Sequence, residues 1–375
     1  MRIVVVFGTR PEAIKLAPVV AELKRRPHVD VRVVTTAQHR ELLDPVLQVF
    51  SLAPDCDLGV MQPRQSLAAL SGRVLTAMDD LLGVDPPDVL IVQGDTTSAF
   101  ICALAAFYRG VPVAHVEAGL RTARPTNPFP EEMNRRLVGA LATLHFAPTE
   151  RARRALLAEG IPGDQVFVTG NTVVDALQFI CASDALARTP SIVSPAAGER
   201  LIVATLHRRE SWGAPLDAMC RAVRSIVEAR SDVRVVLPVH LNPAVGASVR
   251  RTLAEVPRVT LTEPLDYIQF VALMKASWIV LTDSGGVQEE APALGKPVLV
   301  LRDTTERPEA VDEGVARLVG TDPEAIRTAV LDLLDRPDER DRMARAVSPF
   351  GDGRAAERIA NILEARRTAL AATLA

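Results

Sequence analysis

Cysteines and metal-binding patterns are scarce in this chain of 375 residues. Its four cysteines, Cys56, Cys102, Cys181 and Cys220, are scattered and show no CxxC spacing. This argues against a disulfide framework or a zinc site and favours small buried apolar residues in a reducing compartment. The six histidines show no HxxxH or HxH pairing, so the sequence predicts no metal site.

Long apolar runs and an excess of charge of one sign are also missing. No run approaches the roughly 18 apolar residues that a membrane span needs. The apolar N-terminal run is too short for the core of a signal peptide and predicts a first strand. A net charge of −3 provides no field that would hold nucleic acid or an anionic membrane. We therefore expect a cytoplasmic protein without either partner, whose anionic ligands are held by local groups.

The chain is too long for one ordinary core, and its length favours two domains of roughly 150–200 residues. Short β-branched runs alternate with longer amphipathic segments, which predicts parallel sheets covered by helices on both faces. The predicted strands lie at 2–7, 31–36, 88–93, 111–116, 143–148, 200–206, 233–239, 258–262, 277–283, 296–301 and 315–320.

The pattern breaks at residues 188–200, which are rich in Pro, Ser and Ala and lack periodicity. We therefore predict an α/β fold with two Rossmann-like, doubly wound domains, at residues 1–188 and 195–352. In open parallel sheets, ligands bind beyond the carboxyl ends of the strands. The predicted site lies in a cleft between two such sheets, so the residues that directly follow the strands matter most.

The turn after the first strand, FGTRPEAIK, has one glycine instead of a GxGxxG fingerprint. A bound nicotinamide cofactor is therefore not expected. Arg10 lies at the strand end and Lys15 one turn into the following helix, where both can face a phosphate. The alternative is that Arg10 is a solvated loop charge and that Lys15 pairs with Glu12.

Single acids follow the strands that are predicted at 88–93 and 111–116. Asp95 precedes two threonines and a helix, so it is either functional or an ordinary helix N-cap. Glu117 stands between an apolar strand and Ala-Gly, a position that is harder to explain as a cap.

A further pair of acids opens the helix after these strands. Pro130 is expected at its first position, with Glu131 and Glu132 in the first turn. The structural explanation for both acids is complementarity to the helix dipole and i,i+4 pairing with Arg135 and Arg136. The functional explanation is that they join Asp95 and Glu117 in one crevice.

The second half also carries polar residues at its strand ends. His207 is followed by two arginines and an acid, beginning with Arg208, and this setting favours a functional histidine. His240 ends another strand and is either functional or a satisfied core residue.

The stretch LTDSGGVQEEAPALGKP, residues 281–297, follows a buried strand directly. Gly285 and Gly286 let backbone N–H groups approach a ligand at the start of a helix, which is typical of a diphosphate site. Ser284 can add a hydroxyl, Glu290 can accept hydrogen bonds from ribose, and Arg307 supplies a cation. The alternative is a glycine-rich turn that serves only tight strand–helix packing.

Motifs that carry a family resemblance run in order from residue 1 to about residue 365. They are FGTRPEAIKLAPV, TAQHRELLD, VQGDTTSAF, HVEAGLRT, PFPEEMNRR, TGNTVVDAL, HRRES, PVHLNP and TDSGGVQEEAPALGKPVLVLRDTTERPEAV. With them the chain resembles bacterial UDP-N-acetylglucosamine 2-epimerases of the non-hydrolysing type. The resemblance implies the glycosyltransferase-B fold, in which the C-terminal helix, residues 353–375, packs back onto the N-terminal domain. It also implies a homodimer, without cofactor or metal, that interconverts UDP-GlcNAc and UDP-ManNAc for cell-surface polysaccharide synthesis.

The resemblance implies three sets of residues. The catalytic set is Asp95, Glu117, Glu131 and His207. The UDP-binding set is Arg10, Lys15, Phe270, Ser284, Gly285, Gly286, Glu290 and Arg307. Some family members are activated by their own substrate at a second site, which by motif position would comprise Gln38, Arg64, Glu131, Arg208 and His240.

The proton on C2 of the sugar has no adjacent carbonyl, so direct deprotonation faces a very high barrier. Anti elimination of UDP makes this proton removable and yields 2-acetamidoglucal, and syn re-addition with protonation from the other face gives the epimer. Asp95 or Glu131 is the expected base, and Glu117 is expected in the opposite step. The alternatives are a retaining glycosyltransferase, a hydrolysing epimerase that releases ManNAc and UDP, and a catalytically silent nucleotide-sugar sensor.

Overall fold

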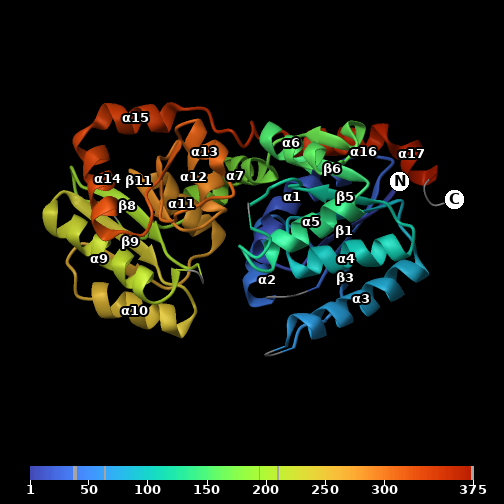
Figure 1. The fold of residues 1–375 in the computed structure, drawn as a ribbon, viewed down its shortest axis with the longest axis horizontal. Helices are drawn as coiled ribbons and strands as arrows, with labels where there is room; N and C mark the ends of the chain where they lie inside the picture. The colour runs from blue at the N-terminus through green and yellow to red at the C-terminus, as the bar shows by residue number, and fades with distance from the viewer. Residues whose placement is uncertain (37–39, 63–64, 123, 194, 209–210, 373–375) are drawn as a thin grey trace. The chain divides into compact units, whose positions relative to one another are not determined.

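The computed structural model describes residues 1–375 except 37–39, 63–64, 123, 194, 209–210 and 373–375. The chain forms two compact units, and each has its own parallel sheet (Figure 1). The first unit comprises Met1–Gln178 and Phe350–Ala375, and the second comprises Phe179–Pro349. Within the described residues, no helix combines the length and the apolar character that crossing a bilayer would require.

The first unit contains a seven-stranded parallel sheet in the order β3-β2-β1-β4-β5-β6-β7. Its strands are β1 (Arg2–Phe7), β2 (Asp30–Thr35), β3 (Cys56–Asp57), β4 (Val89–Gln93), β5 (Val113–Val116), β6 (Leu144–Ala147) and β7 (Val166–Val168). Its helices are α1 (Arg10–Lys24), α2 (Arg40–Val49), α3 (Leu67–Val84), α4 (Thr97–Tyr108), α5 (Glu131–Leu141), α6 (Glu150–Ala158), α16 (Ala355–Ala365) and α17 (Arg367–Ala372). Helices α3 and α4 bury their apolar side chains against one face of the sheet.

The second unit contains a six-stranded parallel sheet in the order β10-β9-β8-β11-β12-β13. Its strands are β8 (Arg200–Thr205), β9 (Val233–Pro238), β10 (Val259–Thr262), β11 (Ile279–Thr282), β12 (Val298–Val300) and β13 (Ala316–Leu318). Its helices are α8 (Asp184–Arg188), α9 (Ala214–Ala229), α10 (Pro243–Leu253), α11 (Tyr267–Ala276), α12 (Val287–Ala293), α13 (Pro308–Asp312), α14 (Pro323–Asp335) and α15 (Pro337–Arg345). Helices α9, α10 and α14 cover one face, and α11 packs on the other.

The predicted fold class, with two doubly wound α/β sheets, is confirmed. Every strand expected from the sequence is present, with ends that differ by at most two residues. The structure adds β3 and β7 at the edges of the first sheet, and these strands of two and three residues are too short to form a recognisable apolar run. Pro130 was expected at the first helical position of α5 but is its N-cap, one residue earlier.

Helix α16 belongs to the first unit, although it is encoded after the whole of the second. The chain passes between the units inside α7 (Thr172–Ala182) and again after Pro349. Arg26, which lies two residues after α1, binds Glu364 and Asn361 of α16 at 3.1 and 2.9 Å. Asp175 of α7 accepts the first two backbone N–H groups of α16 at 3.2 and 2.8 Å, so α16 is anchored at both ends.

Two histidines lie side by side in the core of the first sheet. His115 on β5 and His145 on β6 are register partners, and neither is exposed to solvent. Burial disfavours the charged imidazolium and lowers the pKa of His115 to about 3 and that of His145 to about 4. Both rings are therefore neutral in the folded protein at neutral pH.

The buried histidines should make the first unit less stable in acid. An unfolded histidine has a pKa of about 6.5, so between that pH and the lowered folded values the unfolded chain binds more protons. Stability contributed by the neutral rings is complete above about pH 6.5 and is lost as the pH falls. Each ring contributes a slope of up to about 1.4 kcal/mol per pH unit.

We expect His145→Gln to flatten the pH dependence of urea unfolding between pH 6.5 and pH 4.5. The exposed His28 provides a matched control, because His28→Gln should keep the wild-type slope. Equal slopes for His145→Gln and the wild type would contradict the assignment of this acid sensitivity to the buried ring.

Candidate functional site

The predicted site residues follow the central strands of the two sheets. In the first sheet the strand order reverses between β1 and β4, and in the second between β8 and β11. Ligands of doubly wound sheets bind beyond the carboxyl ends of the strands at such reversal points. Arg10 lies half-buried after β1, Asp95 follows β4, His207 follows β8, and Ser284 follows β11.

Glu117 is held in a buried ion pair at the end of β5. Its carboxylate lies 2.6 Å from the ammonium of Lys15 and also accepts a hydrogen bond from the Gln93 amide. Both Glu117 and Lys15 are buried, and Glu117 has a φ of 63°, which is unusual for a residue with a side chain. The structure thus pairs Lys15 with Glu117 and not with Glu12, which was the alternative.

Glu12 instead links the first turns of two helices. One carboxylate oxygen accepts the N–H groups of Gly8 and Thr9 and the Thr9 hydroxyl, at 3.0, 2.7 and 2.8 Å. The other accepts the hydroxyl of Thr96, the N-cap of α4, at 2.7 Å. Burial raises the pKa of Glu12, although all four hydrogen bonds oppose the shift. This residue fixes the loop after β1 against the loop after β4.

Asp95 does not serve as the helix cap that was its structural explanation. Thr96 caps α4, since its hydroxyl accepts the N–H of Ala99 at 3.0 Å. The Asp95 carboxylate pairs instead with Arg135 at 2.8 Å, and its carbonyl accepts the side-chain amide of Asn134 at 2.9 Å. Its side chain is 30% exposed, so the carboxylate keeps access to solvent and to a ligand.

Glu131 and Glu132, adjacent in the sequence, differ in their surroundings. Glu132 is fully buried and forms salt bridges with Arg135 at 2.9 Å and Arg136 at 3.0 Å, so this acid has the structural role that was considered for both. Glu131 is the first residue of α5 and is only half-buried. Arg135 joins Glu132 to Asp95, so the start of α5 is fixed against the end of β4.

In the second unit, His207 is held by Asp283, the residue directly after β11. The Nδ1 atom of His207 lies 3.1 Å from the Asp283 carboxylate, which also accepts the backbone N–H groups of His207 and Arg208 at 2.9 Å. Asp283 is fully buried, whereas the His207 side chain is 37% exposed. Although burial opposes it, the hydrogen bond and charge of His207 lower the pKa of Asp283.

A cluster of buried charges lies beside the glycine turn. Glu306 binds Arg208, Arg302 and Arg307 at 3.2, 2.8 and 2.7 Å, and Arg307 also binds Glu289 at 2.5 Å. Burial of Glu306 opposes its ionisation, but the charges of the three arginines hold its pKa well below the usual range. We call these five residues the arginine cluster. Three guanidiniums face two carboxylates, which leaves one net positive charge.

Gly285 lies directly under the guanidiniums of this cluster. A Cβ atom at position 285 would come within 2.5 Å of Nη1 of Arg307 and 3.0 Å of Nη2 of Arg208. At Gly286, the N-cap of α12, a Cβ would meet open space. The Glu306 carboxylate would lie 2.9 Å from the same Cβ, so glycine at 285 is needed for the close approach of the whole Arg208–Glu306–Arg307 group. Ser284 is half-buried in the same turn, and its carbonyl accepts the Gln288 amide.

Two further predicted residues have identifiable neighbours. Glu290 is buried on α12, and the Tyr267 hydroxyl donates a hydrogen bond to it at 3.3 Å. Phe270 lies one turn further along α11 and packs, partly buried, on the apolar core.

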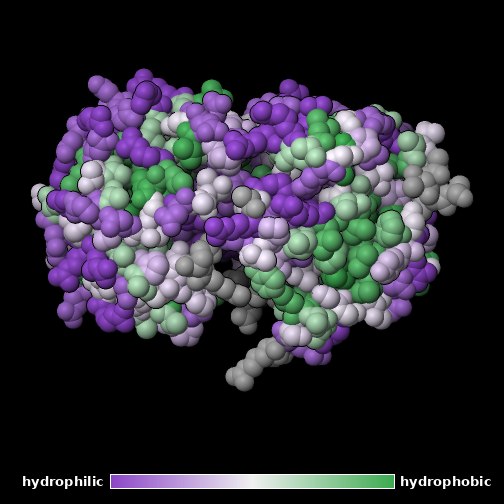
Figure 2. Space-filling model, viewed as in Figure 1, coloured by the Kyte–Doolittle hydropathy of each residue, from purple (hydrophilic) through white to green (hydrophobic). Residues whose placement is uncertain are grey.

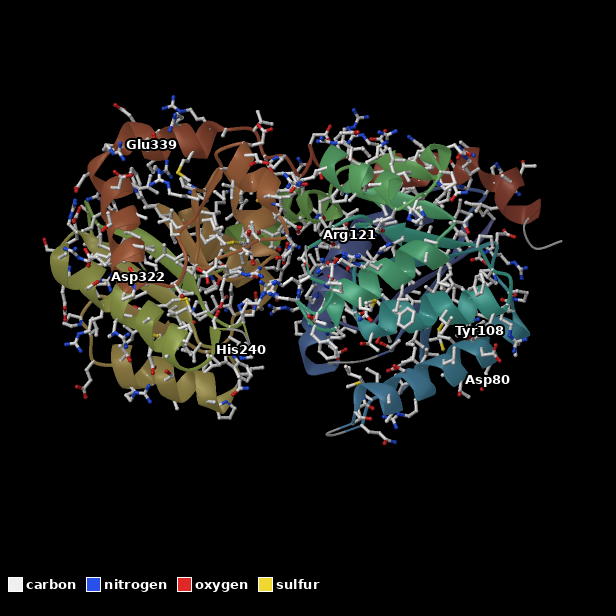
Figure 3. All side chains as sticks on the ribbon, in the orientation of Figure 1. Asp80, Tyr108, Arg121, His240, Asp322 and Glu339 are labelled. Atoms are coloured by element: carbon white, nitrogen blue, oxygen red, sulfur yellow. The ribbon has the colours of Figure 1, made fainter. Side chains whose placement is uncertain are left out.

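His240, which is labelled in Figure 3, is exposed after β9, and its ring stacks on that of His207. The ring centroids are 6.0 Å apart at an interplanar angle of 21°. The Nδ1 atom of His240 accepts the N–H of Asn242 at 3.1 Å, and burial together with the charge of His207 lowers the pKa of His240. Of the predicted second-site residues, Gln38 and Arg64 lie outside the described residues.

Sequence reasoning gave no role to Gln93, Asp283, Glu306 or Tyr267, and it considered Glu12 only as a partner of Lys15. The sequence did contain a signal for Asp283 and Gln93, because each is a polar residue at the end of a buried strand. Predicted site residues also follow the strands that pair with these two, β8 and β5. Tyr267 and Glu306 carried none, because their partners are defined only by the fold.

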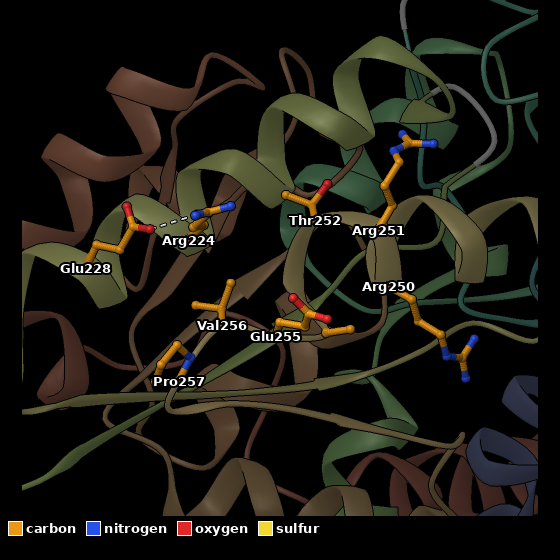
Figure 4. Close-up of a pocket in the computed structure, with 9 residues that line it drawn as sticks. Arg224, Glu228, Arg250, Arg251, Thr252, Glu255, Val256 and Pro257 are labelled. Atoms are coloured by element: carbon orange, nitrogen blue, oxygen red, sulfur yellow. Dashed lines mark hydrogen bonds and ion pairs between the residues drawn. The ribbon is translucent and has the colours of Figure 1, made fainter.

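A separate pocket of about 470 Å³ lies by the C-terminal end of α10 and contains none of the predicted residues (Figure 4). Its arginines already have carboxylate partners, since Arg224 binds Glu228 and Arg251 binds Asp217, each at 2.7 Å. It is therefore a poor candidate for the site of an anionic ligand.

Known proteins are similar to this chain over nearly its whole length. Residues 21–364 match the family model described as UDP-N-acetylglucosamine 2-epimerase. The protein of that name from Salmonella typhimurium is 50% identical, over 99% of this chain and 100% of the relative. The crystal structure of UDP-GlcNAc 2-epimerase from Neisseria meningitidis bound to UDP-GlcNAc has a TM-score of 0.93 at 43% identity, covering 97% of this chain and 100% of that one.

A more distant structure, the glycotransferase of kitacinnamycin, has a TM-score of 0.67 at 14% identity, covering 97% of this chain and 98% of that one. This likeness shows the glycosyltransferase-B fold alone. The family match and the 50% identity at full coverage go further. By both criteria, the chain belongs to the UDP-N-acetylglucosamine 2-epimerase family.

Proposed function

We propose that this chain is a non-hydrolysing epimerase that interconverts UDP-GlcNAc and UDP-ManNAc. The observation that carries the proposal is the Gly285 turn, where a Cβ would come within 3.0 Å of the guanidiniums of Arg307 and Arg208 and of the Glu306 carboxylate that lies between them in the net positive arginine cluster. Such a turn presents fixed positive charge and backbone N–H groups to a diphosphate. The relative from Neisseria meningitidis, whose structure contains UDP-GlcNAc, supports the choice of ligand.

UDP binds to the second unit in this proposal. Its diphosphate contacts Ser284, Gly285 and Gly286, and the arginine cluster supplies the opposing charge. Glu290, oriented by Tyr267, accepts hydrogen bonds from the ribose hydroxyls. Fixed cations stabilise the departing diphosphate more than the bound sugar nucleotide, because negative charge grows on it as the anomeric C–O bond breaks. Arg10 and Lys15 complete the UDP-binding set that the family resemblance implies.

The acids of the first unit then exchange the proton on C2. Asp95 or Glu131 removes it as UDP departs by anti elimination, which yields 2-acetamidoglucal. Glu117 serves the opposite step, in which syn re-addition of UDP and protonation of C2 from the other face give the epimer. The Lys15–Glu117 pair supports a charged carboxylate, which is the form that removes the C2 proton when the reaction starts from UDP-ManNAc. When the reaction starts from UDP-GlcNAc, Glu117 must first take up a proton from solvent, which it then gives to C2.

The activity is tested by incubating purified protein with UDP-GlcNAc alone in D₂O. We expect UDP-ManNAc to form and deuterium to enter C2 of the recovered substrate and product, because elimination releases that proton. NMR spectroscopy and mass spectrometry report both. Free ManNAc with UDP would indicate the hydrolysing reaction, and binding without exchange would indicate a sensor, so either result contradicts the proposal.

The role of Glu117 is tested by Glu117→Gln. General acid–base groups contribute roughly 10²- to 10⁴-fold to rate, so we expect kcat to fall within this range. Glu150→Gln on the surface of α6 is the control and should retain wild-type kcat, since its carboxylate is 56% exposed and pairs with the neighbouring Arg153. Wild-type turnover by Glu117→Gln would remove this residue from the mechanism.

We also propose that the protein is a homodimer that associates through the first unit. Phe107 and Tyr108 at the end of α4, and Met133 and Leu137 on the neighbouring α5, are exposed apolar side chains. Figure 2 shows an apolar patch over these helices. Contiguous apolar surface of this kind is typical of an interface, and a second copy of the chain would bury it.

The homodimer proposal predicts that charge in this patch separates the copies. We expect the double variant Phe107→Glu/Leu137→Glu to elute as a monomer in light-scattering chromatography, whereas the wild type elutes as a dimer. Val347→Glu is the control, because Val347 is 81% exposed but lies in the second unit. A dimeric double variant would place the interface elsewhere.

A further inference from the structure

Asp283 fixes both the backbone and the side chain of His207. Strands β8 and β11 are paired, with Thr205 opposite Thr282, so their next residues leave the sheet together. The Asp283 carboxylate accepts the His207 N–H at 2.9 Å and meets Nδ1 of the ring at 3.1 Å. On the other side of the same residue, the His207 carbonyl accepts the indole N–H of Trp212 at 3.4 Å.

The charge state of Asp283 decides which ring nitrogen of His207 carries the proton. An ionised carboxylate only accepts hydrogen bonds, so the Nδ1 atom that faces it must carry hydrogen. Asp283 is fully buried and is satisfied by two backbone N–H groups in addition to the ring, so its ionised form is retained. In neutral His207 the lone pair therefore lies on Nε2, on the side of the ring away from Asp283.

The stacked His240 has the opposite arrangement. Its Nδ1 atom accepts the Asn242 N–H, so Nδ1 holds the lone pair and the proton of neutral His240 lies on Nε2. No described carboxylate forms an ion pair with His240, whereas His207 has Asp283 at 3.1 Å. The two adjacent rings are thus distinguished by their hydrogen bonds, since Nδ1 donates in His207 and accepts in His240.

We propose that Asp283 is a positioning residue for the reaction, which holds His207 with Nδ1 toward the carboxylate and Nε2 toward the substrate. The inference deepens the proposed epimerisation and rests on it for its kinetic consequences. When the His207 ring is protonated, its Nε2–H can then donate a hydrogen bond to the diphosphate. The ring already has this orientation before the substrate binds. Such preorganisation places the donor without a cost of reorientation during the reaction.

The wild-type protein itself provides the first test. We expect NMR spectra of protein labelled with ¹⁵N-histidine to show the Nδ1–H tautomer for His207, at a pH where its ring is neutral. The resonance is assigned by its loss in His207→Asn. An Nε2–H tautomer in the wild type would overturn the proposal without any change to the Asp283 site.

The second test is the variant Asp283→Asn. Its side chain has the same shape as that of Asp283, but its amide turns an N–H donor toward the His207 ring. We expect the His207 tautomer to change and kcat to fall about 10²-fold, with KM changed by less than about threefold. Asp322→Asn is the matched control in the same unit, because Asp322 caps α14 by accepting the Ala325 N–H and touches no site residue (Figure 3). It should retain wild-type kcat and the wild-type tautomer.

A double-variant cycle separates positioning from a purely structural role. If Asp283 acts through His207, the His207→Asn/Asp283→Asn protein should be no slower than the slower single variant. Additive losses, or lowered thermal stability with an unchanged tautomer, would overturn the proposal. Should the wild type fail to turn over UDP-GlcNAc, the proposed function fails, while the tautomer measurements still decide the role of Asp283.

Discussion

Buried charges at the carboxyl ends of strands are the constraint on which both units depend. An isolated carboxylate loses several kcal/mol of hydration when it is buried, and a fixed cation must compensate for this. In the first unit Lys15 compensates for the burial of Glu117. In the second unit the three arginines of the arginine cluster do the same for Glu306. The Lys15–Glu117 and Arg208–Glu306 pairs join segments that follow different strands, so their geometry depends on the order of the strands in each sheet.

These pairings also hold the loops of the candidate site in place. Glu12 ties the start of α1 to the start of α4, and Arg135 ties α5 to the end of β4. Asp283 joins the ends of β8 and β11 in the same way. Loops are ordinarily the more mobile part of a doubly wound fold, and here each of these loops is crossed by a buried polar contact.

The sequence was sufficient to predict the strands, the two parallel sheets and the strand-end positions of Asp95, Glu117 and His207. Alternation of apolar runs and helices is a local pattern, and the carboxyl-end rule follows directly from it. The partner of Lys15 could not be predicted, because Glu117 lies 102 residues away and only the strand order brings them together. The choice of Thr96 over Asp95 as helix cap depended on where α4 begins, which local propensity does not define to one residue.

The return of α16 to the first unit has a consequence for how the chain is made. The partners of Arg26 and Asp175 lie in α16, which leaves the ribosome only after the whole second unit has been synthesised. The second unit is continuous in sequence and can close its sheet as soon as it emerges, whereas the first remains without one of its covering helices until the end of translation. The half of the protein that is translated first is therefore the last to be completed.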